Sequence, residues 1–195
     1  RNLATLAQGT GNRMTLDMED SSTVEATWEI YYRLHADGFT NVGMVAQAYL
    51  HRIQDDMRKF VSNGGGEIRV CKGIYIEPVS ISYRNREDVR KNFLNVLEIL
   101  LDGGVFAGSA THDDVLVERA VELLARKKTP KSAYEFQMLL GVREPLRESI
   151  VRRGHPLRVY VPFGEHWYAY GVRRLRENPQ IAGYVFKAMF GRLMR

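Results

Sequence analysis

The 195-residue sequence predicts an α/β fold of the (β/α) TIM-like barrel type, in which parallel strands alternate with helices. Short apolar runs rich in β-forming residues alternate with longer helical patterns, and several runs are apolar nearly throughout, as parallel strands covered by helices are. An open dinucleotide-binding sheet would place a G-x-G-x-x-G turn after an early strand, whereas Gly64-Gly65-Gly66 precedes one. A barrel is therefore favoured over an open doubly wound sheet.

Six runs along the chain have the composition of strands. They are Met14 to Met18, Val42 to Tyr49, Glu67 to Tyr75, Val105 to His112, Tyr134 to Leu140 and Leu157 to Pro162. A complete barrel contains about eight strand-helix units, so the sequence predicts a partial barrel with about six of the eight. The segment from Arg1 to Ala7 has the pattern of the end of an amphipathic helix and no initiator methionine. We therefore expect a single domain over residues 1–195 that is incomplete at its N-terminus.

Capping signals and periodicity predict the helices between the strands. Ser22-x-x-Glu25 resembles a capping box that opens a helix running to about His35, and Gly38 supplies a stop. Asp113 and Asp114 suit the start of a later helix, because carboxylates are favourable near a helix N-terminus. That helix would bury Leu116, Ala120, Leu123 and Leu124, and the helix before it would bury Val89, Phe93, Val96, Leu97 and Leu100.

Composition and charge restrict the class of protein. The formal net charge is +5, but the 28 basic and 23 acidic residues are interspersed, and no recognised nucleic-acid module accompanies them. We therefore expect no nucleic-acid partner. Cys71 is the one cysteine, which excludes an internal disulfide and a cysteine-based zinc cluster, and we interpret it as a small buried strand residue. No apolar run approaches the ~18 residues of a membrane span, so we expect a soluble protein without a transmembrane segment.

The predicted strands end in polar residues, and in barrels the C-terminal strand ends form the active site. Arg69 and Lys72 lie within an otherwise strand-like run, where burial of a cation is costly unless an anion compensates. A phosphate, a carboxylate or a reduced flavin would be such an anion, and the alternative is an internal ion pair with Asp17 or Glu19. The polar residues at the strand ends are Asp17, Glu19, Gln47, Tyr49, Arg69, Lys72, Tyr75, Thr111, His112, Glu135, Gln137 and Tyr160.

Two further residues in these segments bear on ligand binding. Gly73 permits close approach of the backbone to a ligand. For His112, a hydrogen bond near a ligand is favoured over metal ligation, because no H-x-x-x-H or similar pair accompanies it. We therefore expect no metal site.

A local pattern follows the last predicted strand. Tyr170, Arg173, Arg174 and Glu177 fall at i, i+3, i+4 and i+7 and so share one face of a helix. Two guanidiniums beside a phenol ring can bind a carboxylate through bidentate hydrogen bonds while the ring packs on an apolar part of the ligand. A solvated helix face would have the same spacing, but the position after the last strand favours a binding face.

Seven short segments occur in the order in which one known family has them. They are Leu16-Asp17-Met18-Glu19, Val45-Ala46-Gln47-Ala48-Tyr49, Ile68-Arg69-Val70-Cys71-Lys72-Gly73-Ile74-Tyr75, Ala110-Thr111-His112, Tyr134-Glu135-Phe136-Gln137-Met138-Leu139, Arg158-Val159-Tyr160-Val161-Pro162-Phe163-Gly164 and Tyr170-x-x-Arg173-Arg174-x-x-Glu177. Their joint order is highly specific, and together they resemble the motifs of proline dehydrogenase of the monofunctional bacterial type.

The resemblance implies a flavoprotein that holds FAD non-covalently and oxidises L-proline to 1-pyrroline-5-carboxylate by hydride transfer. It further implies that electrons pass to a quinone at the membrane surface. Such a protein would serve proline catabolism from the cytoplasm, as a peripheral protein at the inner face of the membrane.

The resemblance also implies roles for individual residues. Arg173 and Arg174 would bind the proline carboxylate, Glu177 would orient Arg173, and Tyr160 and Tyr170 would line the substrate ring. The catalytic residues would be Asp17, Arg69 and Tyr160, with Arg69 stabilising the negative charge of the reduced flavin. The FAD contacts would be Gln47, Arg69, Lys72, Gly73, Ile74, Thr111 and His112.

Three features depart from the family pattern. In the family, the aspartate that corresponds to Asp17 pairs with a lysine on an earlier strand. That strand is not in this sequence. Ile74 stands where the family usually has alanine, which would narrow the space beside the flavin, and Cys71 replaces a common valine. Six strands also leave two open sheet edges, which are a liability for folding.

Some alternatives stay open on the sequence alone. The chain could be a barrel lyase or aldolase with Lys72 as a Schiff-base amine, although the arginine pair would then be unexplained. It could also be a non-catalytic barrel fragment. The tail from Pro179 to Arg195 combines apolar and basic residues, and would form an amphipathic helix that either packs on its own domain or touches a membrane surface.

Overall fold

The computed structural model describes residues 1–165, and all six predicted strands are present in it. Each strand pairs in parallel with the next along the chain, in the order β1-β2-β3-β4-β5-β6. The strands are β1 (Met14–Leu16), β2 (Val42–Gln47), β3 (Glu67–Cys71), β4 (Phe106–Ala110), β5 (Tyr134–Leu139) and β6 (Leu157–Tyr160). This confirms the predicted partial barrel.

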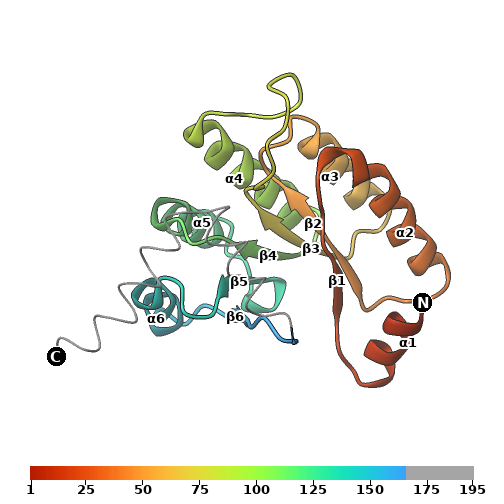
Figure 1. The fold of residues 1–195 in the computed structure, drawn as a ribbon. Coiled ribbons are helices and arrows are strands. Elements are labelled where there is room, and N and C mark those ends of the chain that lie inside the picture. Colours follow the sequence, from red (N-terminus) through yellow and green to blue (C-terminus); the bar gives the residue numbers. More distant parts are fainter. Residues whose placement is uncertain (166–195) are drawn as a thin grey trace.

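Helices connect the strands and lie on the outer side of the arc that the strands form (Figure 1). They are α2 (Val24–Ala36), α3 (Ile53–Ser62), α4 (Arg86–Asp102), α5 (Asp114–Arg126) and α6 (Glu144–Arg152), with 3-10 turns at Ser21–Thr23 and Lys131–Ala133. A further helix, α1 (Asn2–Gly9), precedes β1. Within residues 1–165, no helix has both the length and the apolar character needed to cross a membrane.

The core lies between the sheet and this helical layer. In β3, Ile68 and Val70 are fully buried, whereas Glu67, Arg69 and Cys71 on the opposite face are half-buried. The alternation therefore places one face of β3, which carries the polar Glu67 and Arg69, toward the interior of the barrel. The predicted stripe on α4 and the predicted core face of α5 are both buried, which confirms the helical periodicity there.

The predicted strand ends and the predicted cap of α2 are wrong in detail. Every predicted strand runs past its observed end; the run Glu67 to Tyr75, for example, leaves the sheet after Cys71. The cap of the turn before α2 is Asp20, whose Oδ1 accepts from the Ser22 amide at 3.0 Å. Glu25 does not complete a capping box, because its carboxylate bonds Arg52 of the neighbouring helical turn at 2.5 Å.

The sheet has two edges within the described residues, since β1 pairs only with β2 and β6 only with β5. Beside β1 lies an apolar groove of about 450 Å³ between α1 and α2. Its apolar lining consists of Leu3, Met14, Leu16, Ile30 and Leu34. The open edges expected from the strand count are therefore present in residues 1–165.

Candidate active site

Arg69 and Asp17 form an ion pair where β1 and β3 end. Arg69 Nη2 lies 2.5 Å from Asp17 Oδ1. Strand register places both on the same face, because Leu16 pairs with Met44 and the next residue of β2 pairs with Arg69. The two side chains are 26% and 63% exposed, so the pair is open to the concave side of the sheet. The internal ion pair that the sequence left as an alternative is therefore present.

Two buried polar atoms near this pair have no hydrogen-bond partner among residues 1–165. One is Arg69 Nε, a donor, and the other is Gln47 Oε1, an acceptor. The Gln47 amide nitrogen is occupied, since it donates to the carbonyls of Met18 at 3.1 Å and Glu19 at 3.0 Å. A buried polar atom without a partner costs about 1–3 kcal/mol. The two atoms therefore suit a bound ligand with both acceptor and donor groups, as a flavin ring has.

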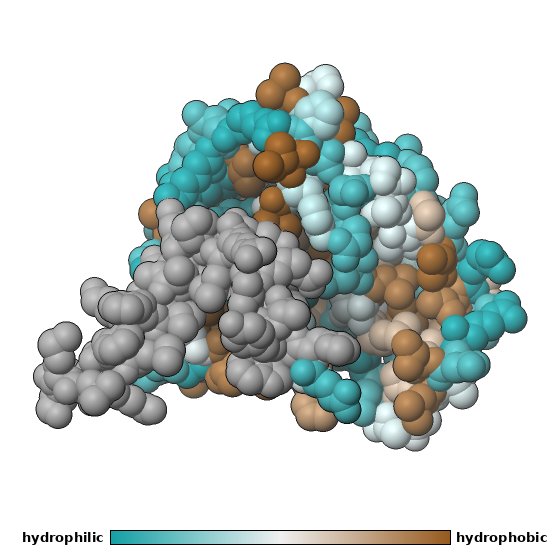
Figure 2. Space-filling view, viewed as in Figure 1, coloured by the Kyte–Doolittle hydropathy of each residue, from teal (hydrophilic) through white to brown (hydrophobic). Residues whose placement is uncertain are grey.

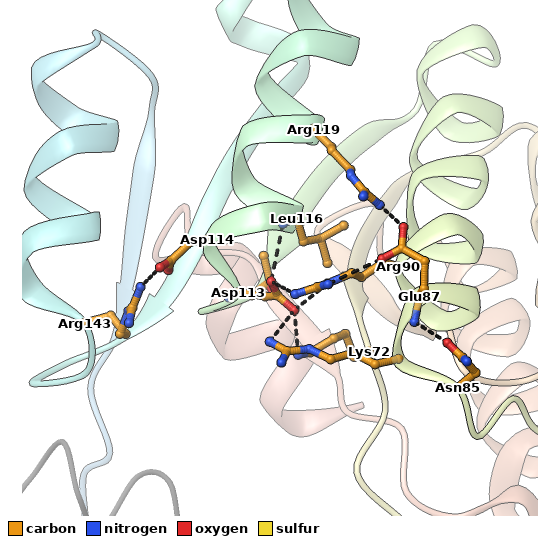
Figure 3. Close-up of polar contacts among 11 residues, drawn as sticks. Lys72, Asn85, Glu87, Arg90, Asp113, Asp114, Leu116, Arg119 and Arg143 are labelled. Carbon is orange, nitrogen blue, oxygen red and sulfur yellow. Dashed lines mark hydrogen bonds and ion pairs between the residues drawn. The ribbon is translucent and has the colours of Figure 1, made fainter.

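The buried Asp113 carboxylate joins α4, α5 and the residue after β3 through five donor atoms from four residues (Figure 3). Its side chain is 1% exposed and accepts from Arg90 Nη2 at 2.7 Å and Arg90 Nε at 3.0 Å. Arg86 Nη2 lies 3.2 Å and Lys72 Nζ 3.4 Å from the same carboxylate, which also accepts from the Leu116 amide as the N-cap of α5. The predicted start of this helix is confirmed, while its link to Lys72 was not foreseen.

Opposing effects act on the pKa of Asp113. Burial alone would raise this pKa, but the hydrogen bonds from Arg90 and Arg86 and the positive charge of Lys72 outweigh burial and hold it well below its usual range. Lys72 Nζ is held in this ion pair at 3.4 Å, whereas a Schiff-base amine must be free to attack a carbonyl. The arrangement therefore does not favour the lyase alternative. The i, i+4 spacing of Arg86 and Arg90 is the sequence signal that could have indicated the cluster.

Gly73 is required by the packing of Tyr49 as well as by its own backbone. Its φ is +94°, and a Cβ there would lie 2.2 Å from Tyr49 Cδ1. We expect Gly73→Ala to destabilise the fold by about 1–3 kcal/mol through backbone strain alone, with a further loss from the contact. Gly64→Ala is the matched control, since Gly64 has φ +98° and no atom within 4 Å of its Cβ position. Equal losses in urea unfolding would contradict the role of Tyr49.

His112 is a hydrogen-bond acceptor at the end of β4. Its Nε2 accepts from the Leu139 amide of β5 at 2.9 Å. Burial, with smaller effects from the charges of Lys72 and Arg143, lowers the pKa of His112 to about 4. The ring is therefore neutral at pH 7, and its proton lies on Nδ1, the nitrogen left to donate to a ligand. Among residues 1–165, no group of three or more His, Cys, Asp or Glu is placed to hold a metal ion.

The remaining predicted site residues lie in several parts of the structure. Glu135 and Gln137 of β5 bond each other at 2.8 Å, and Glu135 also binds Arg158 of β6 at 2.5 Å. Thr111 is buried and its hydroxyl accepts from the Asp113 amide at 3.2 Å. The side chains of Ile74 and Tyr160 are 42% and 45% exposed. Tyr75 donates to Glu19. The predicted binding face of Tyr170, Arg173, Arg174 and Glu177 lies outside the described residues.

Comparison with known proteins gives a consistent family. The family model described as "Proline dehydrogenase" matches residues 1–186. "Proline dehydrogenase 1" of Bacillus subtilis is 35% identical over 176 residues, which are 90% of this chain and 58% of that protein. "Proline dehydrogenase" of Deinococcus radiodurans is 35% identical over 190 residues, or 97% of this chain and 61% of that protein. The chain thus spans about three fifths of the length of these relatives.

Solved structures show the same arrangement of strands and helices. The proline utilization A protein of Bdellovibrio bacteriovorus, inactivated by N-propargylglycine, matches with a TM-score of 0.81 and 29% identity, over 90% of this chain and 21% of that one. A Bradyrhizobium japonicum proline utilization A mutant matches with a TM-score of 0.82 over 96% of this chain and 22% of its own. At 24% identity, the second likeness bears on the fold alone.

Proposed function

The chain belongs to the proline dehydrogenase family, and on that premise we propose that the protein oxidises L-proline to 1-pyrroline-5-carboxylate in proline catabolism, with FAD as hydride acceptor. The observation on which this proposal rests is Arg69, which is paired with Asp17 on the concave face and keeps a buried donor without a partner in residues 1–165. A fixed cation beside a redox cofactor stabilises the negative charge that reduction adds. We propose one FAD-binding domain over residues 1–195.

The described residues fit the nucleotide cofactor in several ways. When bound, FAD would supply the hydride acceptor. Gln47 Oε1 and Arg69 Nε offer an acceptor and a donor that are buried and unpaired within residues 1–165. His112 offers its Nδ1 proton, and Lys72 offers a positive charge at the end of β3. The proposed FAD contacts are Gln47, Arg69, Lys72, Gly73, Ile74, Thr111 and His112.

The substrate site is proposed from the family motifs, in a segment outside the described residues. Arg173 and Arg174 would bind the proline carboxylate, with Glu177 orienting Arg173, while Tyr160 and Tyr170 would line the ring. Asp17, Arg69 and Tyr160 are the proposed catalytic residues. We further propose a quinone as electron acceptor and a cytoplasmic protein that works at the inner face of the membrane.

The first test is an absorbance spectrum of the full-length protein with FAD, before and after anaerobic addition of L-proline. Bleaching of the bound flavin by proline, with no bleaching by a non-cyclic amino acid, is the expected result. A protein that binds FAD but is not reduced by proline would contradict the proposed substrate. A protein that does not bind FAD would contradict the proposed cofactor.

Arg173→Met and Arg174→Met are each expected to raise the KM for proline at least ~10-fold, because a charge-assisted contact contributes about 1.5–3 kcal/mol. Steady-state kinetics of the full-length protein provides the measurement. Arg176→Met is the matched control, because its spacing from Tyr170 is off the i, i+3, i+4, i+7 face. Unchanged kinetics in both test variants would refute the carboxylate assignment.

A further inference from the structure

Glu77 forms a buried contact between two loops at the end of the barrel that holds the candidate site. It lies in the loop between β3 and α4 and is 5% exposed. Its Oε1 accepts from the Ser21 amide at 2.7 Å, and its Oε2 accepts from the Ser21 hydroxyl at 2.7 Å. The Tyr49 hydroxyl is a third donor at 3.5 Å. A buried carboxylate needs such donors, because an unpaired one is costly.

The loops joined by Glu77 come from strands that are not neighbours in the sheet. Ser21 follows β1 and Glu77 follows β3, and β2 lies between the two strands. In Figure 1 the loop between β3 and α4 rises at the top of the molecule, near the segment that leads from β1 into α2. Tyr75 also donates to the Glu19 carboxylate, and the Gln47 side-chain amide donates to the Glu19 carbonyl. The Glu77–Ser21 contact is thus the centre of a bridge across the end of β2.

The β3–α4 loop has little apolar packing to hold it. Four aliphatic side chains on the loop are partly or largely exposed: Ile74 at 42%, Ile76 at 92%, Val79 at 68% and Ile81 at 38%. Brown, hydrophobic atoms are visible at the top of the molecule in Figure 2, where Figure 1 places this loop. Because buried apolar contacts normally fix a segment, the position of this loop must depend on polar contacts.

Backbone hydrogen bonds fix the second half of the loop and also its first residue, since the Tyr49 amide donates to the Lys72 carbonyl at 2.9 Å. The Tyr83 amide donates to the Tyr49 carbonyl at 2.8 Å, and the His51 amide donates to the Ile81 carbonyl at 2.9 Å. These bonds hold residues 81–83 against the loop that follows β2. The segment before them contains Gly73 and Ile74, both proposed FAD contacts, and two side chains anchor it to the β1–α2 loop. Glu77 accepts two hydrogen bonds from Ser21, and Tyr75 donates to Glu19.

We propose that Glu77 is a positioning residue: through Ser21 it holds the Gly73–Ile74 segment at a fixed distance from Asp17 and Arg69. The inference rests on the proposed flavin and proline site, on which Glu77 acts only through other residues. A misplacement of about 1 Å in a reacting group can cost on the order of 10²-fold in rate. The contact would therefore matter for the rate of flavin reduction more than for the affinity for proline.

The test compares variants of the full-length FAD-bound protein by stopped-flow flavin reduction with proline. Glu77→Ala is expected to lower the reduction rate on the order of 10²-fold with little change in the Kd for proline. Glu77→Gln should restore most of this rate, because its amide can accept from the Ser21 amide and donate to the Ser21 hydroxyl. Ser21→Ala, which removes one of the two bonds, should give an intermediate rate. Ser80→Ala is the matched control, a serine-to-alanine exchange at an exposed position of the same loop.

A second readout tests the loop without relying on turnover. Hydrogen–deuterium exchange of the same variants without proline should become faster in residues 17–22 and 73–80 and remain unchanged in α5. If Glu77→Ala does not fold, Ser21→Ala and Glu77→Gln decide the question. Wild-type rates and wild-type exchange in Ser21→Ala and in a folded Glu77→Ala would overturn the positioning role. If proline does not reduce the flavin bound to the wild-type protein, the proposed function is refuted instead. The exchange measurement is made without proline, so its outcome for the Glu77 contact is independent of that result.

Discussion

Arg69→Met is expected to slow reduction of the bound flavin by proline on the order of 10²- to 10³-fold, the loss found when one preorganised donor is removed from a site of developing charge. Methionine keeps most of the side-chain length but removes the guanidinium, its bond to Asp17 and the Nε donor that has no partner in residues 1–165. Anaerobic stopped-flow absorbance gives the reduction rate, and its dependence on proline concentration gives the substrate affinity. The Kd for FAD is also expected to rise, while the Kd for proline should change less.

A double-mutant cycle on Asp17 and Arg69 separates the orientation of the guanidinium from its charge. Asp17→Asn removes the anion that holds the guanidinium, and the double variant should be less impaired than the product of the single effects, because the residues act together. Arg13→Met is a matched control, since Arg13 pairs with Glu67 at 3.0 Å at the opposite end of β3. An effect of Arg69→Met on the KM for proline alone would contradict its assignment to the flavin.

Local patterns were sufficient to predict the elements of the fold. The buried faces of α4 and α5 follow a helical period that depends only on which residues are apolar, and their predicted members are buried. Asp113 was predicted to start α5 because side-chain capping acts within one helical turn, and it does cap α5. The strand ends were less predictable. Polar residues such as Lys72 belong to the functional end of the barrel, where the chain leaves the sheet.

Contacts between distant segments could not be predicted from local patterns. Glu25 was assigned to a capping box, but its partner is Arg52, 27 residues further along the chain. The two bonds between Ser21 and Glu77 span 56 residues and depend on how far each loop reaches across β2. For Arg69 the sequence left two alternatives, an anionic ligand and an internal ion pair with Asp17 or Glu19. The register of β1, β2 and β3, which the sequence does not specify, establishes the ion pair.

Asp113→Ala should have the largest effect on stability, a loss of about 3–5 kcal/mol, because it leaves one largely buried cation, Arg90, without its anion. Arg90, whose side chain is 13% exposed, would lose two hydrogen bonds. Asp113→Asn should lose less, because asparagine caps a helix as well as aspartate does. The gap between the two variants in urea unfolding at pH 7 therefore measures mainly the cap, and the gap between wild type and Asp113→Asn measures the charge. Asp114→Asn, at an exposed carboxylate paired with Arg143, is the control and should cost at most ~1 kcal/mol.

The pH dependence of these variants tests the cause of the stabilisation. The pKa of Asp113 is lower in the folded protein than in the unfolded chain, so its contribution is complete above the unfolded pKa and is lost as the pH falls. The gap in unfolding free energy between wild type and Asp113→Asn should stay constant from pH 7 to about pH 4 and then narrow by up to about 1.4 kcal/mol per pH unit. A gap that persists unchanged down to pH 2 would mean that the shape of the side chain, not its charge, stabilises the site. Because Asp113 binds Lys72 as well as Arg86 and Arg90, a charge-dependent gap would also show that the stability of this end of the barrel is linked to a residue proposed to contact FAD.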